Sequence, residues 1–268
     1  MVTFTAELLG TLALRPYVVV FLAIYLALAA RDLGLRGTLA FLGWGWGVAF
    51  LAEYASTRVG IPFGLYHYTG DTRGAELYLS NVPFFDSLSF PFLAYAAWCL
   101  ARWALRESAS PRTAAAAAAL MMLLDVVIDP VAVRGERWFL GRIFYYPEGG
   151  IYFGVPLSNF AGWAIVGAVI VGGYVLAARG RPPCGSPRGG AVFYYVILLF
   201  NLVVTLRIGE PVLLGAGILL HLVVFLVLWW AVGGVSGTAG GPMPAPGSDG
   251  GGSVEAASLG ARGGFSQP

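Results

Sequence analysis

The sequence is poor in charge. Only 11% of its 268 residues are charged, whereas 58% are hydrophobic, and a soluble domain carries about 25% charged residues. This deficit indicates that most of the protein surface meets lipid rather than water. The net charge of +2 is too small to predict nucleic-acid binding, so no such partner is expected.

Lysine is absent, and cysteine and histidine are rare. All sixteen basic residues are arginine, which excludes an opsin and a pyridoxal enzyme because both need a lysine for their Schiff base. Cys99 and Cys184 are interpreted as unpaired. His67 and His221 lie on distant segments without metal-ligand spacing. The sequence therefore predicts no metal site and no cofactor.

Long apolar runs are what the chain does contain. Several reach about 18 residues, which is enough to cross a hydrocarbon core of about 30 Å as helices. They lie near residues 12–30, 38–57, 84–103, 113–133, 154–178, 191–208 and 211–232. The predicted fold class is all-α: a polytopic membrane helix bundle of about seven transmembrane helices.

The two ends of the chain differ in composition. The first run could be a signal peptide, since Ala27-Leu28-Ala29 resembles a cleavage site. However, Glu7 precedes the run and no basic segment opens it, so a retained helix is favoured. Residues 236–268 are rich in Gly, Ser and Pro and predict a disordered tail. This leaves residues 1–235 as the transmembrane domain.

Arginine placement orients the helices. The loops after the first, third and fifth runs, with Arg31, Arg36 and Arg102 among them, hold eight Arg against two acids, and the alternate loops hold six Arg against five acids. The positive-inside rule places the first set in the cytoplasm. We therefore expect the N-terminus outside the cell, and the C-terminal tail with it.

Polar residues gather at the other, non-cytoplasmic end. Glu53 lies late in the second run, and Asp125 and Asp129 lie late in the fourth, four residues apart and thus on nearly the same helix face. Asp86 and Asn159 open the third and fifth runs. A carboxylate within a membrane span usually marks function, although a hydrogen-bonded network between helices is an alternative. Asp86 could also be a helix cap.

Two close carboxyl groups in a low-dielectric site do not easily both ionise, which leaves an acid beside a base. Such a pair suits general acid–base catalysis. The adjacent loops are rich in aromatic residues, which is typical of an interfacial belt. The sharper interpretation is a lining for a long apolar substrate, with ring faces that can stabilise a cation.

Two stretches of the chain resemble one another. Tyr66-His67-Tyr68 is followed by Val82-Pro83 and then Ser89-Phe90. Tyr145-Tyr146 is followed by Val155-Pro156 and then Asn159-Phe160. A duplicated helix-loop-helix unit would explain this pattern, and so would chance in an aromatic-rich chain. The sequence leaves both explanations open.

Three blocks carry a family resemblance. They are Glu53 followed by Gly60-Ile61-Pro62-Phe63-Gly64-Leu65-Tyr66-His67-Tyr68, then Asp125-Val126-Val127-Ile128-Asp129-Pro130, then residues 149–163, which read GGIYFGVPLSNFAGW. In this order they resemble the membrane-integral carotenoid biosynthesis family that includes the CruF-type carotenoid 1,2-hydratases and the archaeal bisanhydrobacterioruberin hydratase. The resemblance covers roughly residues 40–235.

The resemblance implies an activity and a location. A carotenoid hydratase adds water to the terminal 1,2 double bond of an acyclic carotenoid (lycopene-, γ-carotene- or bacterioruberin-precursor-like) and forms a tertiary alcohol without a redox cofactor. The expected location is the cell (inner) membrane of a prokaryote. The expected partners are the carotenoid and membrane lipid, and the oligomeric state is left open.

The hydration chemistry assigns roles to the polar residues. Asp125 and Asp129 are the predicted acid–base pair, in unassigned order, while Glu53 assists or positions water and Asn159 holds water or a carboxyl group. The residues predicted to bind substrate are Tyr66, Tyr68, Tyr145, Tyr146, Tyr152 and Trp163. Alternative functions are a cyclase or prenyl-adding enzyme, a proton-coupled transporter, and a membrane scaffold without chemistry.

Overall fold

The computed structural model describes residues 4–178 and 183–234, which form seven α-helices. They are α1 (Phe4–Leu14), α2 (Pro16–Val59), α3 (Phe84–Leu105), α4 (Pro111–Ala132), α5 (Leu157–Ala177), α6 (Arg188–Arg207) and α7 (Pro211–Gly234). Between them lie β1 (His67–Tyr68), β2 (Tyr78–Leu79), β3 (Val82–Pro83), the short 3-10 helix η1 (Gly135–Arg137) and β4 (Phe144–Tyr145). The predicted tail, residues 236–268, lies outside the described residues.

Helix α2 is two membrane segments joined at a sharp kink. Gly34 has φ 70° and ψ 163°, a backbone conformation that is essentially restricted to glycine. The Tyr25 hydroxyl donates to the Thr38 carbonyl at 2.9 Å, whereas 13 residues of straight helix would separate them by about 20 Å. The two halves therefore fold back on each other, and the expected loop around Arg31 and Arg36 is a kink within continuous helix.

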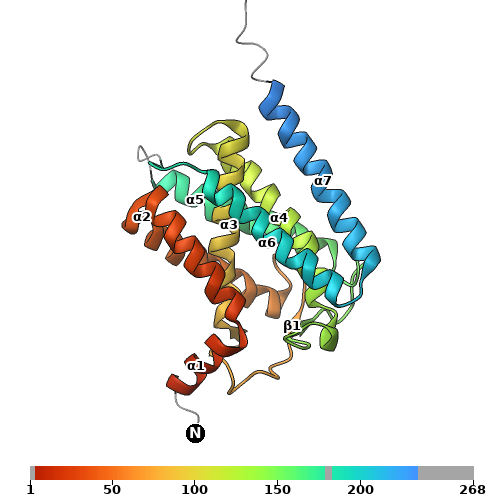
Figure 1. Cartoon of the computed structure of the whole chain (residues 1–268). Helices are drawn as coiled ribbons and strands as arrows, with labels where there is room; N and C mark the ends of the chain where they lie inside the picture. The colour runs from red at the N-terminus through yellow and green to blue at the C-terminus, as the bar shows by residue number, and fades with distance from the viewer. Residues whose placement is uncertain (1–3, 179–182, 235–268) are drawn as a thin grey trace, which may run out of the picture.

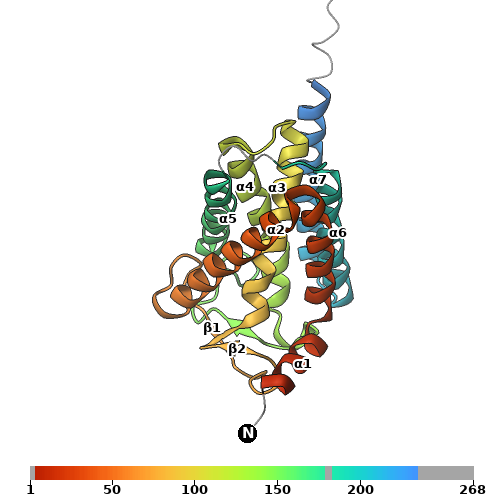
Figure 2. The same ribbon diagram turned by 90° about the vertical axis from the view of Figure 1, so that its left-hand side faces the viewer.

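The helices pack as a membrane bundle around α3 (Figures 1 and 2). Six helices are long and apolar enough to cross a membrane, and the two halves of α2 bring the number of spanning segments to seven. Helix α3 is buried along most of its length and contacts α2, α4 and α6. Helix α7 lies at the edge with most of its apolar side chains exposed. The predicted all-α membrane bundle is confirmed.

Local sequence signals set the ends of several helices. Ser110 caps α4 by accepting the Thr113 amide at 3.1 Å, and the Thr113 hydroxyl accepts the Ser110 amide at 3.0 Å. Pro111 follows at the first helical position, where its fixed φ and missing N–H cost nothing. Helices α3 and α5 both begin directly after a proline, Pro83 and Pro156. These starts place Asp86 and Asn159 in the first turn of their helices.

The loops with the short strands all lie at one end of the bundle, together with α1 (Figure 2). The seven segments alternate in direction, so α2 begins at this end and α7 finishes at the opposite end (Figure 1). Helix α7 thus ends on the side opposite to the N-terminus, which differs from the side expected for the tail; the tail itself lies outside the described residues. An odd number of spans necessarily separates the two ends.

A buried ion pair holds the opposite end of the bundle together. Arg102 was expected in a loop but lies inside α3, where its two Nη atoms donate to Asp32 at 2.6 and 3.2 Å. Both side chains are almost fully buried. The Asp32 carbonyl also accepts the Cys184 amide at 2.8 Å. This pair ties the α2 kink to α3 and to the segment before α6, far from the loops with the short strands.

Candidate active site

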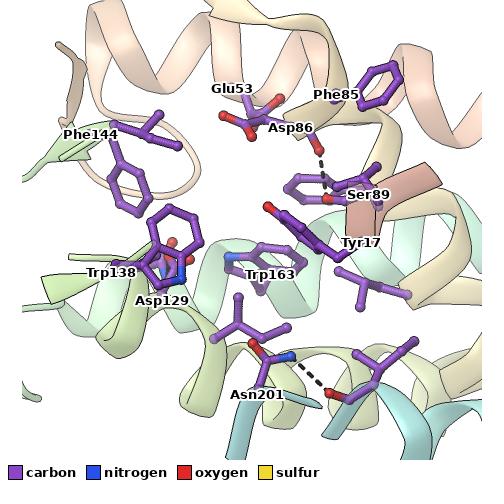
Figure 3. A pocket seen from close by; sticks show the side chains of 18 of the residues that line it. Tyr17, Glu53, Phe85, Asp86, Ser89, Asp129, Trp138, Phe144, Trp163 and Asn201 are labelled. Carbon is purple, nitrogen blue, oxygen red and sulfur yellow. Dashed lines mark hydrogen bonds between the residues drawn. The ribbon is translucent and has the colours of Figure 1, made fainter. Parts of the chain in front are cut away.

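A cavity lies at the loop-covered end of the bundle. Together with the part that is open to solvent, it contains about 990 Å³ of space free of atoms. Its polar lining consists of Glu53, Asp86, Ser89, Asp129, Asn159, Asn201 and the tyrosines Tyr17, Tyr66, Tyr68 and Tyr146. The rest is apolar and largely aromatic, with Phe21, Phe63, Phe85, Phe90, Phe92, Trp138, Phe139, Phe144, Trp163 and Phe200. In Figure 3, Glu53 and Asp86 lie together, and Asp129 lies apart from them beyond the aromatic rings.

Asp125 and Asp129 share one amide group. The Asn159 Nδ2 atom donates to Asp125 Oδ2 at 2.7 Å and to Asp129 Oδ2 at 2.8 Å. Each carboxyl group thus has one oxygen on the same amide donor, which places the two acidic groups side by side. Asp129 borders the cavity, whereas Asp125 is fully buried behind it. The i,i+4 spacing on α4 thus produces a coupled pair of which one member reaches the cavity.

Glu53 forms a second polar centre on the C-terminal half of α2. Its Oε1 atom accepts the Tyr68 hydroxyl at 2.8 Å, and its Oε2 atom accepts the Ser87 hydroxyl. The side chain is 4% exposed. Both partners are neutral hydroxyl groups, so no direct ion pair offsets a negative charge on this carboxyl group.

Asp86, beside Glu53, belongs to a buried charged cluster. Arg15, between α1 and α2, donates from Nη1 to Asp86 Oδ1. Its Nε and Nη2 atoms donate to Glu76 at 2.6 and 3.0 Å, and the Thr72 hydroxyl donates to Glu76 at 2.5 Å. Arg15 and Glu76 are nearly inaccessible, at 2% and 1% exposure. The cluster fastens the loop before α3 over the cavity.

Three tyrosines of the loops connect the two polar centres. Tyr68 contacts Glu53, and the Tyr146 hydroxyl donates to Asp129 at 3.4 Å. The Tyr66 ring lies 5.4 Å from the Tyr68 ring and 5.8 Å from the Tyr146 ring. Burial, and then the nearest carboxyl group, raises the pKa of all three hydroxyls well above the usual value. They therefore remain protonated donors at neutral pH.

The predicted substrate-binding residues separate into two groups. Tyr66, Tyr68, Tyr146 and Trp163 line the cavity, and the Trp163 ring stacks on Phe90 with centroids 4.2 Å apart. Two others lie outside the described lining. The Tyr145 ring contacts His67 and the Arg142 guanidinium, and the Tyr152 ring packs against Phe153 and Phe160.

The glycine-containing blocks are joined by close contacts. A Cβ atom on Gly162 would lie 2.6 Å from the Phe63 ring and 2.8 Å from the Pro62 carbonyl oxygen. A Cβ atom on Gly150 would lie 1.9 Å from the Val155 carbonyl carbon. Glycine at these two positions allows the first loop to pack on α5 and the second loop to turn tightly. The blocks therefore build the walls of the cavity.

The two resembling stretches meet in the structure as a symmetric pair. Strand β1 pairs antiparallel with β4, with His67 opposite Tyr145 and Tyr68 opposite Phe144. Each stretch supplies a tyrosine that donates to a membrane carboxyl group, Tyr68 to Glu53 and Tyr146 to Asp129. Each is followed by a Val-Pro pair and a helix. This arrangement favours duplication over chance as the origin of the pattern.

Comparison with known proteins gives the family. A family model described as carotenoid biosynthesis protein matches residues 8–228, which includes every segment that lines the cavity. The chain belongs to the carotenoid biosynthesis protein family. Within 121 residues it is 33% identical to bisanhydrobacterioruberin hydratase from Haloarcula japonica, a match that covers 44% of this chain and 38% of that protein. No solved structure matches the chain.

Some residues of the site were not singled out from the sequence. Arg15 is the single residue between α1 and α2, and Glu76 lies in an ordinary polar loop. Ser87 is a common residue type in an apolar helix. A single arginine directly before a long apolar run was the available signal, because an isolated charge there needs a buried partner. Asp86 was noted, with a cap as its alternative role.

Proposed function

We propose that this member of the carotenoid biosynthesis protein family is a hydratase that adds water to the terminal 1,2 double bond of an acyclic carotenoid. The observation that carries the proposal is a single cavity with carboxyl groups in two places and aromatic rings between them. The name of the Haloarcula relative supports it. Lycopene, γ-carotene and a bacterioruberin precursor are the candidate substrates.

The cavity supplies each group that hydration needs. A carboxylic acid protonates the terminal alkene, which places positive charge on the tertiary carbon. Ring faces such as that of Trp163 and a nearby carboxylate stabilise this charge. Water then adds to the cation and loses a proton to a carboxylate. The proton given to the alkene is replaced by the one that the added water loses, so the net reaction consumes one water and transfers no electrons. Side chains of this chain can therefore perform every step.

Four residues are the proposed catalytic set. Asp129 and Glu53 border the cavity and are placed to exchange protons with substrate or water. Asp125 lies behind Asp129, away from the cavity, and influences the charge of Asp129. The Asn159 amide nitrogen donates to both carboxyl groups and so orients them. The aromatic lining holds the apolar chain end. Its Tyr66, Tyr68, Tyr146 and Trp163 are the proposed substrate-binding residues.

Expression in cells that accumulate lycopene tests the function. We expect pigments heavier by the mass of one or two waters, and a loss of at least about 100-fold in the Asp129→Asn variant. A cyclised pigment of unchanged mass, or one with five added carbons, would indicate the alternative enzymes. Unmodified lycopene, γ-carotene and bacterioruberin precursor in cells with membrane-inserted protein would refute a hydratase.

A further inference from the structure

The two polar centres of the cavity occupy equivalent places in the repeated unit but carry different chemistry. Helices α3 and α5 each begin after a proline, and the third residue from that proline faces a carboxyl group of the preceding helix. In the second unit this residue is Asn159, which faces Asp129. In the first unit it is Asp86, which lies beside Glu53 (Figure 3). The first unit thus has a carboxyl group at the place where the second unit has an amide.

The second unit is built to hold a negative charge. Asp129 accepts hydrogen bonds from the Asn159 amide and the Tyr146 hydroxyl. Donors aimed at a carboxyl group favour its ionised form. Asp125 accepts only from Asn159 among the described residues, and its other oxygen has no partner there. Asp129 is therefore the carboxylate that can accept a proton from water.

The first unit has too little positive charge for its acids. Glu53, Asp86 and Glu76 are gathered around one cation, Arg15. Three of the donor hydrogen bonds of Arg15 go to Glu76 and Asp86, and none that is described goes to Glu53. One ionised carboxyl group next to a second, buried one favours the protonated form of the second.

The groups around Glu53 also favour its protonated form. The groups that face it are Asp86 and Ser87 from α3, Tyr66 and Tyr68 from the first loop, and, at longer range, Arg15. Asp129 lies across the cavity on α4. The tyrosines are neutral, the guanidinium is bonded to other carboxylates, and the nearest charge is the negative one of Asp86. Glu53 therefore carries a proton at the cavity surface.

We propose that Glu53 is the proton donor of the hydration, that Asp86 is a positioning residue fixed by Arg15 which keeps Glu53 protonated, and that Asp129 is the base. This assignment rests on the proposed function. The Glu53 proton forms a C–H bond with the terminal alkene carbon as the π bond breaks. The oxygen of a water molecule bonds to the tertiary carbon of the cation, and a proton of that water passes to Asp129. The proton then returns from Asp129 to Glu53; Tyr146 donates to the first of these carboxyl groups and Tyr68 to the second.

Infrared spectroscopy of the purified protein in lipid tests the protonation without any substrate. At neutral pH we expect a carboxylic-acid C=O band that shifts when the wild type carries carbon-13-labelled glutamate and that is missing in Glu53→Gln. Asp71→Asn, a change at an exposed acid of the loop before α3, is the control and should leave the band in place. A band that does not respond to labelled glutamate would overturn the assignment.

The pH dependence of hydration tests the role of Asp86. Asp86→Asn removes the negative charge that lies beside Glu53, while Arg15 stays paired with Glu76, so Glu53 ionises at lower pH. We expect the alkaline limb of the activity profile to move down by about one unit or more. Activity at neutral pH should fall at least about tenfold and recover on acidification, whereas Asp71→Asn should keep the wild-type profile.

The possible outcomes distinguish a failure of the roles given to Glu53 and Asp86 from a failure of the proposed hydratase function. A lower rate with an unchanged pH profile in Asp86→Asn would show a purely structural role and refute the positioning role. Full activity of Glu53→Gln would refute the role of Glu53 as the proton donor. If the wild type hydrates no carotenoid but shows the Glu53 band, the proposed function fails while the protonation of Glu53 stands. If the Asp86→Asn protein does not insert, the labelled wild type still decides whether Glu53 is protonated.

Discussion

Asn159 is the residue on which the geometry of the α4 carboxyl pair depends. Its single amide nitrogen reaches Asp125 and Asp129 at 2.7 and 2.8 Å, and the side chain is 1% exposed. No water or loop group can easily replace it at that depth. The bidentate contact holds the Asp129 carboxyl group at the cavity surface and keeps it from rotating toward Asp125.

Replacement of Asn159 by alanine should therefore affect both stability and activity. Losing a donor to two buried carboxyl groups is expected to cost about 1–3 kcal/mol, and misplacing Asp129 should slow hydration by about 100-fold. Thermal unfolding in detergent and product formation from lycopene measure the two effects.

The matched control is Asn81→Ala. The Asn81 side chain accepts from Arg58 in a surface loop, and surface changes are usually within about 0.5 kcal/mol. Wild-type activity and stability in Asn159→Ala would contradict the role given to this amide.

At the scale of elements, the kink of α2 decides where Glu53 lies. The N-terminal half of α2 carries Tyr17 and Phe21 to the cavity, and the C-terminal half returns Glu53 to the same end. The Tyr25–Thr38 hydrogen bond and the buried Asp32–Arg102 pair hold the turn. A straight α2 would place Glu53 more than a membrane thickness away from Tyr17.

Gly34→Ala tests the kink. A side chain at φ 70° and ψ 163° is strained by about 1–3 kcal/mol, so we expect a lower unfolding temperature in detergent and reduced activity. Gly43→Ala is the control, since Gly43 lies in regular helix with no atom near the site of a Cβ. It should be neutral or stabilising by up to about 1 kcal/mol. Equal melting temperatures for the two variants would count against a strained hinge.

At the scale of the whole molecule, the cavity and the arginine-rich loops lie at opposite ends. Arg31 and Arg36 are exposed at the α2 kink, on the far side from the short strands and α1 (Figure 2). The positive-inside rule assigns the kink end to the cytoplasm. The site would then take its water from the non-cytoplasmic side.

Cysteine labelling checks this orientation. Cys184 is exposed in the segment before α6, at the arginine-rich end, and Cys99 is buried. A membrane-impermeant maleimide added to intact cells should leave Cys184 unmodified and should react only after permeabilisation. A Cys184→Ser, Asp71→Cys protein should be labelled in intact cells. The reverse pattern would show the opposite orientation.

Much of the fold could be predicted because membrane helices are specified locally. Uninterrupted apolar runs of sufficient length determine the number of spans, and the missing lysine restricts the chemistry. The spacing of Asp125 and Asp129 determines that they share a helix face, since helical periodicity is a property of neighbouring residues. The same locality explains why Glu53, Asp129 and Asn159 could be assigned to one end of the bundle.

Only the tertiary structure decided which of these groups border the cavity. In the fold, Asp125 lies behind Asp129, and Tyr145 and Tyr152 lie outside the cavity lining. Arg15 bonds to Glu76 and Asp86, which are 61 and 71 residues further along the chain. No local pattern encodes such pairings, because they depend on the α2 kink and on how the loops pack. The sequence by itself determined which side chains could carry protons. The packing determined which carboxyl groups border the cavity and which side chains surround each of them.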